Sequence, residues 1–282
     1  MFDYHIHPNY SIDAEGSLEE FCEEALRKGL KEIAFTTHLD TDPVGDDCFV
    51  NVKGKHVSTR SSVWLEDYET SIRSADDKYR DRGLRVRLGV EIDYISEIES
   101  ALPENFHSTD FDIILGSMHL VDHIAISATG RAEAAFKNYS KEELGSKYYT
   151  LLIEAVESGL FDIVAHIDLY RRFGLEFYGE GIKDIWKPHI GILADAMKKN
   201  NVGFEVNTSP LRRGQQQPMP EAAIINELKE QGVSIVTVGS DAHQPQDVGS
   251  DFGTAYCLLR KAGFSHISLF SKRKVRKQKI PQ

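Results

Sequence analysis

The feature that most constrains the fold is a repeated alternation of short apolar runs with segments of helical spacing. The apolar runs, read as strands, cover residues 2–7, 32–37, 85–90, 112–116, 161–165, 202–207 and 233–238. Strands joined through helices favour a parallel sheet with right-handed crossovers. About seven such units suit a closed or nearly closed barrel. The rival is an open doubly wound sheet, but no glycine-rich nucleotide loop follows any of these runs. We therefore expect an α/β barrel.

Helix signals fall between the strands. Ser17 and Glu20 have the spacing of a capping box, as do Ser140 and Glu143, so a helix is predicted to begin at each place. Other helices are predicted over residues 63–82, 182–200 and 222–231. Loops or irregular segments are predicted over residues 41–62, 120–139 and 209–218. A last helix and a short strand near 266–270 complete the expected fold.

Composition narrows the class of protein. With 282 residues, 41% of them hydrophobic, and with no linker or low-complexity segment, we expect one globular domain over residues 1–282. No apolar run approaches the length of a membrane span. The three cysteines, Cys22, Cys48 and Cys257, form no C-x-x-C motif, which indicates a reducing cytoplasm.

Charge also excludes some partners. The net charge of −11 disfavours nonspecific binding of nucleic acid. The basic residues between 272 and 279 are interpreted as a solvated end of the chain. An acidic protein with an anionic substrate would need bound cations, which can dominate the local field.

Nearly every predicted strand ends in a histidine, aspartate or glutamate, the residue types that commonly bind metals. His5 and His7 are two residues apart in a strand, so both imidazoles leave the same face of the sheet. The others in this set are His38, Glu91, His119, His166, Asp241 and His243. Because a parallel barrel gathers the carboxyl ends of its strands on one rim, we expect these side chains to share a metal site. Imidazole and carboxylate together suit zinc, manganese or iron and do not distinguish among them.

Each of these residues also has a structural explanation when taken alone. His119 and His166 have the character of hydrogen-bonded core histidines, Glu91 that of a salt-bridged strand end, and Asp241 that of a helix cap. Their common position at strand ends favours the metal site. The remaining histidines do not follow the pattern: His56, His107, His123, His189 and His266. Nothing in their spacing brings even His123 or His189 to the site.

The order and spacing of these motifs resemble the PHP (polymerase and histidinol phosphatase) superfamily. The resemblance rests on His5-x-His7, Asp13, Thr37-His38, Gly89-Val90-Glu91, Ser117-Met118-His119, Ala165-His166 and Ser240-Asp241-Ala242-His243. These motifs span almost the whole chain. Three further stretches, residues 168–172, 205–212 and 262–274, are similar to the stand-alone histidinol-phosphatase branch.

The resemblance implies a distorted, TIM-like (β/α)7 barrel with its active site at the carboxyl ends of the strands. It also implies a cluster of three divalent metal ions. The implied ligand sets are His5, His7, Glu91 and Asp241 for one ion, Glu91, His119 and His166 for a second, and Asp13, His38 and His243 for the third. Glu91 would then bridge two ions.

Such a cluster suits hydrolysis of a phosphate ester. Two metal ions roughly 3.5–4 Å apart activate a water and neutralise phosphoryl oxygens. Glu91, Asp241 and Arg212 are the predicted catalytic residues. Arg172 and Arg212 are the predicted phosphate contacts, because a planar guanidinium pairs with phosphate through two hydrogen bonds.

Alternatives remain around the predicted phosphate site. Arg171 and Arg213 are the neighbouring candidates, and each of the four arginines has a solvated surface position as its simpler explanation. Glu205, which ends a strand, has three possible roles: it orients a metal ligand, it binds an amine of the substrate, or it belongs to a polar network. The general acid for the leaving group is not identified.

The leading functional hypothesis is a cytoplasmic, metal-dependent phosphomonoesterase acting on L-histidinol phosphate in histidine biosynthesis. A second is a PHP-type phosphatase for phosphotyrosine or another small phosphoester, or a PHP nuclease. A third, from another class, is a noncatalytic metal-binding or polymerase-associated module. The sequence gives no indication of oligomeric state.

Overall fold

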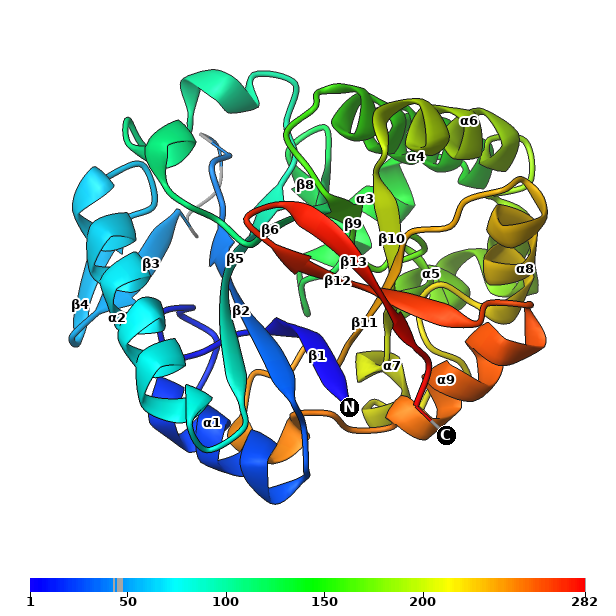
Figure 1. Cartoon of the computed structure of the whole chain (residues 1–282). Helices are drawn as coiled ribbons and strands as arrows, with labels where there is room; N and C mark the ends of the chain where they lie inside the picture. The colour runs from blue at the N-terminus through cyan, green and yellow to red at the C-terminus, as the bar shows by residue number, and fades with distance from the viewer. Residues whose placement is uncertain (43, 45–47, 282) are drawn as a thin grey trace.

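The central feature of the computed structural model is a sheet of seven parallel strands, ordered β1-β2-β5-β6-β9-β10-β11 (Figure 1). The structure describes residues 1–42, 44 and 48–281. The strands are β1 (Phe2–Ile6), β2 (Glu32–Leu39), β5 (Arg85–Asp93), β6 (Ile113–Ser117), β9 (Ile163–Val164), β10 (Gly203–Asn207) and β11 (Val236–Gly239). Ile6 bridges in parallel to Ala242, and the amide of Asp241 donates to the carbonyl of His5 at 2.8 Å. The sheet therefore nearly closes, and the predicted barrel is confirmed.

Helices surround this sheet (Figure 1). They are α1 (Leu18–Arg27), α2 (Ser62–Arg80), α4 (Lys141–Glu157), α5 (Arg171–Tyr178), α6 (Ile190–Asn200), α8 (Ala222–Glu230) and α9 (Phe252–Lys261). Both predicted capping boxes are present, Ser17 with Glu20 and Ser140 with Glu143. Each satisfies amide groups that have no partner inside the first helical turn.

The helix predicted over 182–200 is wrong in its first half. α6 begins only at Ile190, after Pro188, whose ring disfavours a helical conformation in the residue before it. The preceding residues form the 3-10 helix η3 (Gly179–Asp184). α5, before η3, is a further helix that the sequence interpretation did not separate from its surroundings.

Two segments predicted to be loops or irregular contain β-hairpins. One is β3 (Phe49–Val52) with β4 (Lys55–Ser58), and the other is β7 (Leu120–Val121) with β8 (Ile124–Ala125), followed by α3 (Ala132–Asn138). The predicted loop at 209–218 begins with the four-residue helix α7 (Ser209–Arg212). Between β5 and β6 the chain has only the 3-10 turns η1 (Ile98–Ser100) and η2 (Phe106–Ser108), so this crossover contains no α-helix.

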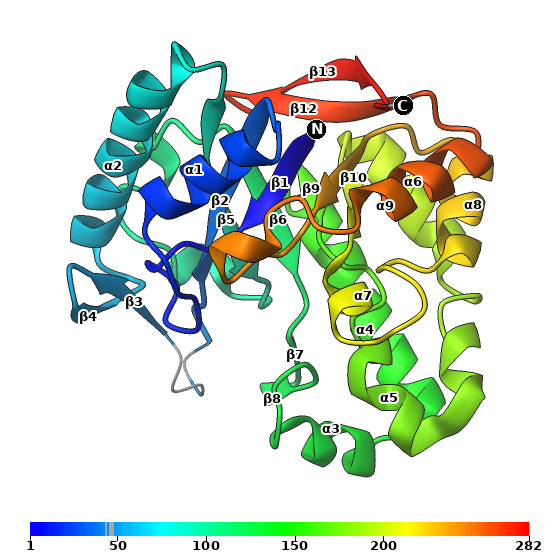
Figure 2. The ribbon, with the colours of Figure 1, turned by 90° about the horizontal axis from the view of Figure 1, so that it is seen from below.

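The basic C-terminal residues are not merely a solvated tail. They form β13 (Lys274–Lys279), which pairs antiparallel with β12 (His266–Ser271) across the amino-terminal end of the barrel (Figures 1 and 2). The Arg276 guanidinium lies 2.6 Å from Glu32, and that of Arg273 lies 3.1 Å from Asp162. Both carboxylates stand at or just before the start of barrel strands, so this hairpin closes that end.

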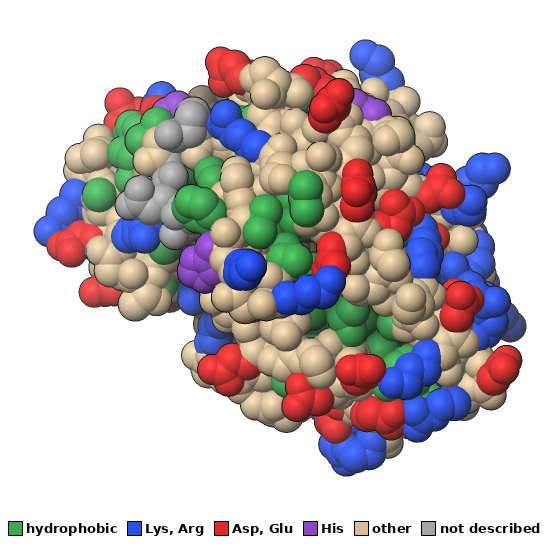
Figure 3. All heavy atoms as spheres, turned by 90° about the vertical axis from the view of Figure 1, so that its left-hand side faces the viewer, with side chains coloured by type: hydrophobic (Ala, Val, Ile, Leu, Met, Phe, Trp, Pro, Cys, Tyr) green, Lys and Arg blue, Asp and Glu red, His purple; other side chains and the backbone are tan. Residues whose placement is uncertain are grey.

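The opposite end of the barrel carries β7, β8 and α3, as the view from below shows (Figure 2). The carboxyl ends of the barrel strands face this open end. On the face shown in Figure 3, basic and acidic side chains are interspersed and form no single basic patch. None of the helices in the described part of the chain is both long and apolar enough to cross a membrane.

Candidate metal centre

Glu91 lies at the middle of a cluster of imidazoles at the carboxyl end of β5. Its side chain is 1% exposed. Oε1 lies 2.8 Å from Nε2 of His166 and 3.7 Å from Nε2 of His119. Oε2 lies 3.0, 3.4 and 3.5 Å from ring nitrogens of His38, His5 and His7. One carboxylate therefore faces histidines from four strand ends, the arrangement expected of a bridging ligand.

Asp241 closes the cluster on the side of β1 and β11. Its Oδ1 lies 3.4 Å from Nε2 of His7 and 3.5 Å from Nδ1 of His243. Its Oδ2 accepts a hydrogen bond from Ser209 at 2.9 Å. Asp241 has a φ of 53° and His166 a φ of 26°. Positive φ costs a residue with a side chain about 1–3 kcal/mol, so the fold holds both side chains in strained positions at the site.

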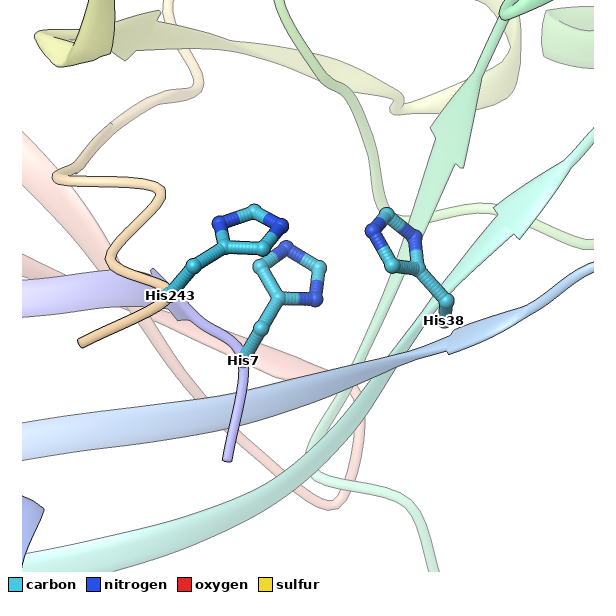
Figure 4. A group of neighbouring side chains, drawn as sticks. All are labelled: His7, His38 and His243. Atoms are coloured by element: carbon cyan, nitrogen blue, oxygen red, sulfur yellow. The ribbon is translucent and has the colours of Figure 1, made fainter. Parts of the chain in front are cut away.

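A second group of imidazoles lies toward the mouth of the cluster. His7, His38 and His243 turn toward one another (Figure 4), with ring centroids 4.1 Å apart for His7 and His38 and 4.3 Å for His7 and His243. Asp13 lies beside them, with Oδ2 3.2 Å from Nε2 of His243 and 3.7 Å from Nε2 of His38. Asp13 is the most exposed of the predicted ligands.

The donor atoms fit divalent cations. Among the described residues there are four groups in which three donor atoms lie within 4.8 Å of one another: His7, His38 and His243; His5, His7 and Asp241; His5, Glu91 and His166; His38, Asp40 and His119. All nine predicted ligands therefore meet at one end of the barrel. The grouping differs from the predicted ligand sets: His119 lies with His38 and Asp40, His7 takes the place of Asp13 beside His38 and His243, and Glu91 and His166 lie with His5. The number of ions stays a prediction.

The protonation preferences differ among the histidines of the cluster. Burial opposes protonation of His5 and His38, but nearby carboxylates outweigh it and raise the pKa of His5 well above its ordinary value and that of His38 to about 10. Burial lowers the pKa of His119 to about 3, and burial together with the neighbouring His38 and His243 holds that of His7 well below its ordinary value. Burial opposes ionisation of Glu91, but the charges of His5 and His119 outweigh it and lower the pKa. Neutral imidazole and ionised carboxylate are the forms that bind metals.

Glu205 orients His5 from beneath the cluster. Its carboxylate is fully buried, and Oε1 lies 2.7 Å from Nδ1 of His5. Oε2 accepts from the amide of His166 at 3.2 Å and from Asn207 at 3.1 Å. Of the three roles weighed for Glu205, these contacts correspond to orienting a metal ligand. A Cβ at Gly239 would collide with both Glu205 and His5, so this packing requires glycine.

The cluster forms the floor of a cavity of about 1260 Å³. Arg172 and Arg213 line it. Arg212 instead donates to the carbonyl of Asp241 at 3.2 Å and lies 3.5 Å from Asp247. Arg171 points away from the cavity, since its guanidinium lies 2.7 Å from Asp168 and donates to the carbonyl of Pro218 at 2.7 Å.

Sequence reasoning missed several polar residues of the cavity wall. They are Asp40, Asp42, Asp93 and His123. Two of them could have been predicted from the sequence. Asp40 follows the predicted ligand His38 by two residues, and Asp93 follows Glu91 by two, so in a strand each shares a face with that ligand. His123 was considered without a reason to choose it. His189 instead stacks on Tyr149, with centroids 5.1 Å apart.

Comparisons with known proteins give relatives that match nearly the whole chain. Two similar curated proteins are the probable histidinol-phosphatase of Deinococcus radiodurans (28% identity, 93% of this chain and 94% of that protein) and the histidinol-phosphatase of Bacillus subtilis (28%, 88% and 95%). The fold resembles that of the histidinol phosphate phosphatase of Lactococcus lactis, solved with zinc, L-histidinol and phosphate, with a TM-score of 0.78 at 21% identity over 98% of each chain. The putative histidinol phosphatase of Listeria monocytogenes gives 0.74 at 19% identity, over 90% of this chain and 99% of the other. A model of the PHP domain matches residues 3–209, well over half of the sequence. The chain therefore belongs to the PHP domain family.

Proposed function

We propose that this protein is a metal-dependent phosphatase of small phosphate monoesters and that its substrate is L-histidinol phosphate. The observation that carries the proposal is the convergence of six histidines and three carboxylates on the floor of a cavity that Arg172 and Arg213 also line. The names of the relatives that match nearly the whole chain support the choice of substrate. The L-histidinol and phosphate in the Lactococcus lactis structure support it further.

The cluster would hold three divalent ions of zinc, manganese or iron. The nine residues proposed as ligands are His5, His7, Asp13, His38, Glu91, His119, His166, Asp241 and His243. Bound divalent cations would lower the pKa of a water and neutralise charge on the phosphoryl oxygens. The protein's own share of this chemistry is to fix the ligands, and Glu205 does so by holding Nδ1 of His5.

The phosphate group would be held by Arg172 and Arg213. Both line the cavity, and burial together with the charge of Arg213 lowers the pKa of Arg172, so an anion between the two guanidinium groups relieves their repulsion. Arg212 would act on the reaction indirectly, through its hydrogen bond to the backbone of Asp241. The contacts of Arg171 favour a structural role for it.

The proposal takes residues 1–282 as one phosphatase domain. Asp241 and His243 come after the stretch that matches the family model, yet they complete the cluster that begins at His5. Because the three cysteines, Cys22, Cys48 and Cys257, are scattered and form no C-x-x-C motif, a reducing cytoplasm is the compartment we propose.

The test is a comparison of kcat/KM among phosphate esters, with protein loaded with zinc or manganese. L-Histidinol phosphate should be preferred over phosphotyrosine by about 100-fold or more, because buried polar groups reject a substrate that leaves them unpaired. Equal or reversed preference would point to another small phosphoester. Cleavage of DNA would point to a nuclease, and metal binding without hydrolysis of any ester would point to a noncatalytic module.

Two matched variants separate the site from the fold. Glu91→Gln should abolish hydrolysis, because it removes the charge that faces five imidazoles. Glu32→Gln replaces another buried glutamate, at the closed end of the barrel beside Arg276, and should retain hydrolysis.

A further inference from the structure

A histidine and an aspartate form a pair in the cavity wall outside the metal cluster. Nδ1 of His123 lies 2.7 Å from Oδ2 of Asp42. Asp42 is 4% exposed, and its other oxygen accepts from the amide of Val44 at 2.7 Å. His123 is half-exposed, and both residues line the cavity whose floor is the cluster. Because the pair uses Nδ1, the ring presents Nε2 as its remaining nitrogen.

Each member of the pair follows a proposed metal ligand by four residues. Asp42 follows His38 beyond the end of β2, and His123 follows His119 at the tip of the β7–β8 hairpin. The amide of Ile126 donates to the carbonyl of His119 at 2.9 Å, which ties the base of this hairpin to the cluster. Four residues span at most about 14 Å, so the backbone of His123 lies no farther than that from the backbone of His119.

The turn that carries His123 is not one that favours histidine. Asp122 has a φ of 48° and His123 a φ of 66°, the pattern of a two-residue hairpin turn in which asparagine and glycine predominate. The other residue of the turn, Asp122, has a partner of its own, because its carboxylate lies 2.7 Å from the ammonium group of Lys147. Because glycine would make the same turn with less strain, the imidazole at 123 indicates a role for the side chain itself.

We propose that His123, oriented by Asp42, is the general acid that protonates the leaving group. This inference rests on the proposed phosphatase function and deepens it. As the oxygen of the attacking water forms its bond to phosphorus, the bond between phosphorus and the ester oxygen breaks and its electron pair stays on that oxygen. The proton on Nε2 of His123 passes to the same oxygen and yields the alcohol. The attacking water keeps one proton on the phosphate that it forms and releases the other to solvent, and solvent returns a proton to the ring.

The pair has the features that this step requires. An alkoxide is a strongly basic leaving group, so cleavage of an alkyl phosphate gains most from a positioned proton donor. Arg172 and Arg213 cannot supply the proton, because guanidinium groups stay protonated in proteins. General acid catalysis uses the doubly protonated ring, in which Nδ1–H donates to the carboxylate of Asp42 and Nε2–H is left for the substrate. The inferred substrate class is therefore phosphate monoesters of aliphatic alcohols.

The test compares two esters that differ in their need for an acid. For His123→Gln, kcat/KM for L-histidinol phosphate should fall by about 100-fold or more, the usual contribution of a general acid. For p-nitrophenyl phosphate, whose leaving group departs as a stable anion, it should fall by less than about threefold. Asp122→Asn is the matched control in the same turn and should change both values by less than about threefold, because Asp122 contacts Lys147 and not the cavity.

The other results are equally decisive. An equal loss on both esters would assign His123 a structural role, and no loss on either would mean that the proton comes from elsewhere; both overturn the inference. Should His123→Gln fail to fold, Asp42→Asn gives the same comparison, with a selective loss on L-histidinol phosphate expected. If the unaltered protein hydrolyses neither ester, the proposed function fails instead, which is a distinguishable outcome.

Discussion

Replacing Glu205 with glutamine should weaken metal binding without touching a metal ligand. The Glu205 carboxylate accepts on both oxygens: Oε1 faces Nδ1 of His5 at 2.7 Å, and Oε2 faces the amide of His166 and the side chain of Asn207. Glutamine has the same shape but only one accepting oxygen. In either orientation its NH2 group therefore points at a donor, and the group is too buried to turn toward water.

The size of the effect follows from which side loses its acceptor. If NH2 faces His5, the ring loses the acceptor that fixes its orientation. Nε2 of His5, the nitrogen that faces Glu91, is then held less firmly in position for a metal. Loss of such a supporting contact typically weakens metal affinity by 10–100-fold, or about 1.4–2.7 kcal/mol. If NH2 faces His166 and Asn207 instead, the backbone that positions the proposed ligand His166 loses a hydrogen bond, which weakens metal affinity by a similar factor.

The measurement is competition for zinc between the protein and a chromophoric chelator. Glu205→Gln should show at least a tenfold higher Kd, with an unchanged far-UV circular dichroism spectrum. Glu32→Gln, a buried glutamate at the other end of the barrel, should bind zinc like the unaltered protein. A Kd within about threefold of the unaltered protein for Glu205→Gln, or an equal loss in Glu32→Gln, would refute the reasoning.

Three further outcomes are expected. Arg172→Gln should raise KM for the phosphate ester about tenfold and weaken inhibition by inorganic phosphate without lowering the Tm, because Arg172 lines the cavity. The adjacent Arg171→Gln should instead lower the free energy of unfolding, measured in denaturant, by about 3–5 kcal/mol, because it breaks a buried ion pair with Asp168. The reverse pattern would contradict the assignment of the two arginines. Burial raises the pKa of Asp76, but Arg85 and other donors lower it from 3.8 to about 2. Between these two pH values the unfolded chain binds more protons than the folded chain, so the free energy of unfolding falls as the pH drops from about 4 to 2. Asp76→Asn should make this fall less steep in acid unfolding. An unchanged slope would exclude a contribution from Asp76. Chelation of the metals should lower the Tm, which zinc should restore, and should abolish binding of inorganic phosphate in calorimetry; phosphate binding by the metal-free protein would contradict a cation-dependent site.

The candidate site was predictable from the sequence because strand geometry is regular. A parallel strand delivers its last side chains to one rim, so His38, Glu91 and His166 needed only their strand ends to be recognised. The same period placed His5 beside His7. What the pattern did not settle was the direction of the arginines. Arg171 and Arg172 are neighbours at the start of α5 and point in different directions, which depends on how that helix packs.

The hairpins were missed because their signals are short. Lys53 and Gly54 form a turn with φ of 52° and 81°, and glycine there is the usual sign of a two-residue hairpin. The strands on either side are only four residues long and partly exposed, so their alternation is weak. In the basic C-terminal run, charge masked the strand: Arg273 and Arg276 face carboxylates at the barrel end that only the folded chain brings near.

The charge of the cavity explains why an acidic protein can act on an anion. Seven carboxyl groups and four basic side chains line the cavity among the described residues, so without metal its lining is negative and repels a phosphate ester. The three divalent cations proposed here would bring six positive charges and reverse the sign on the floor, while the carboxylates farther out, such as Asp42, would remain. The substrate would then meet a cationic floor under an anionic wall. That polarity suits a molecule with a phosphate at one end and basic nitrogens at the other, and L-histidinol phosphate has this distribution of charge.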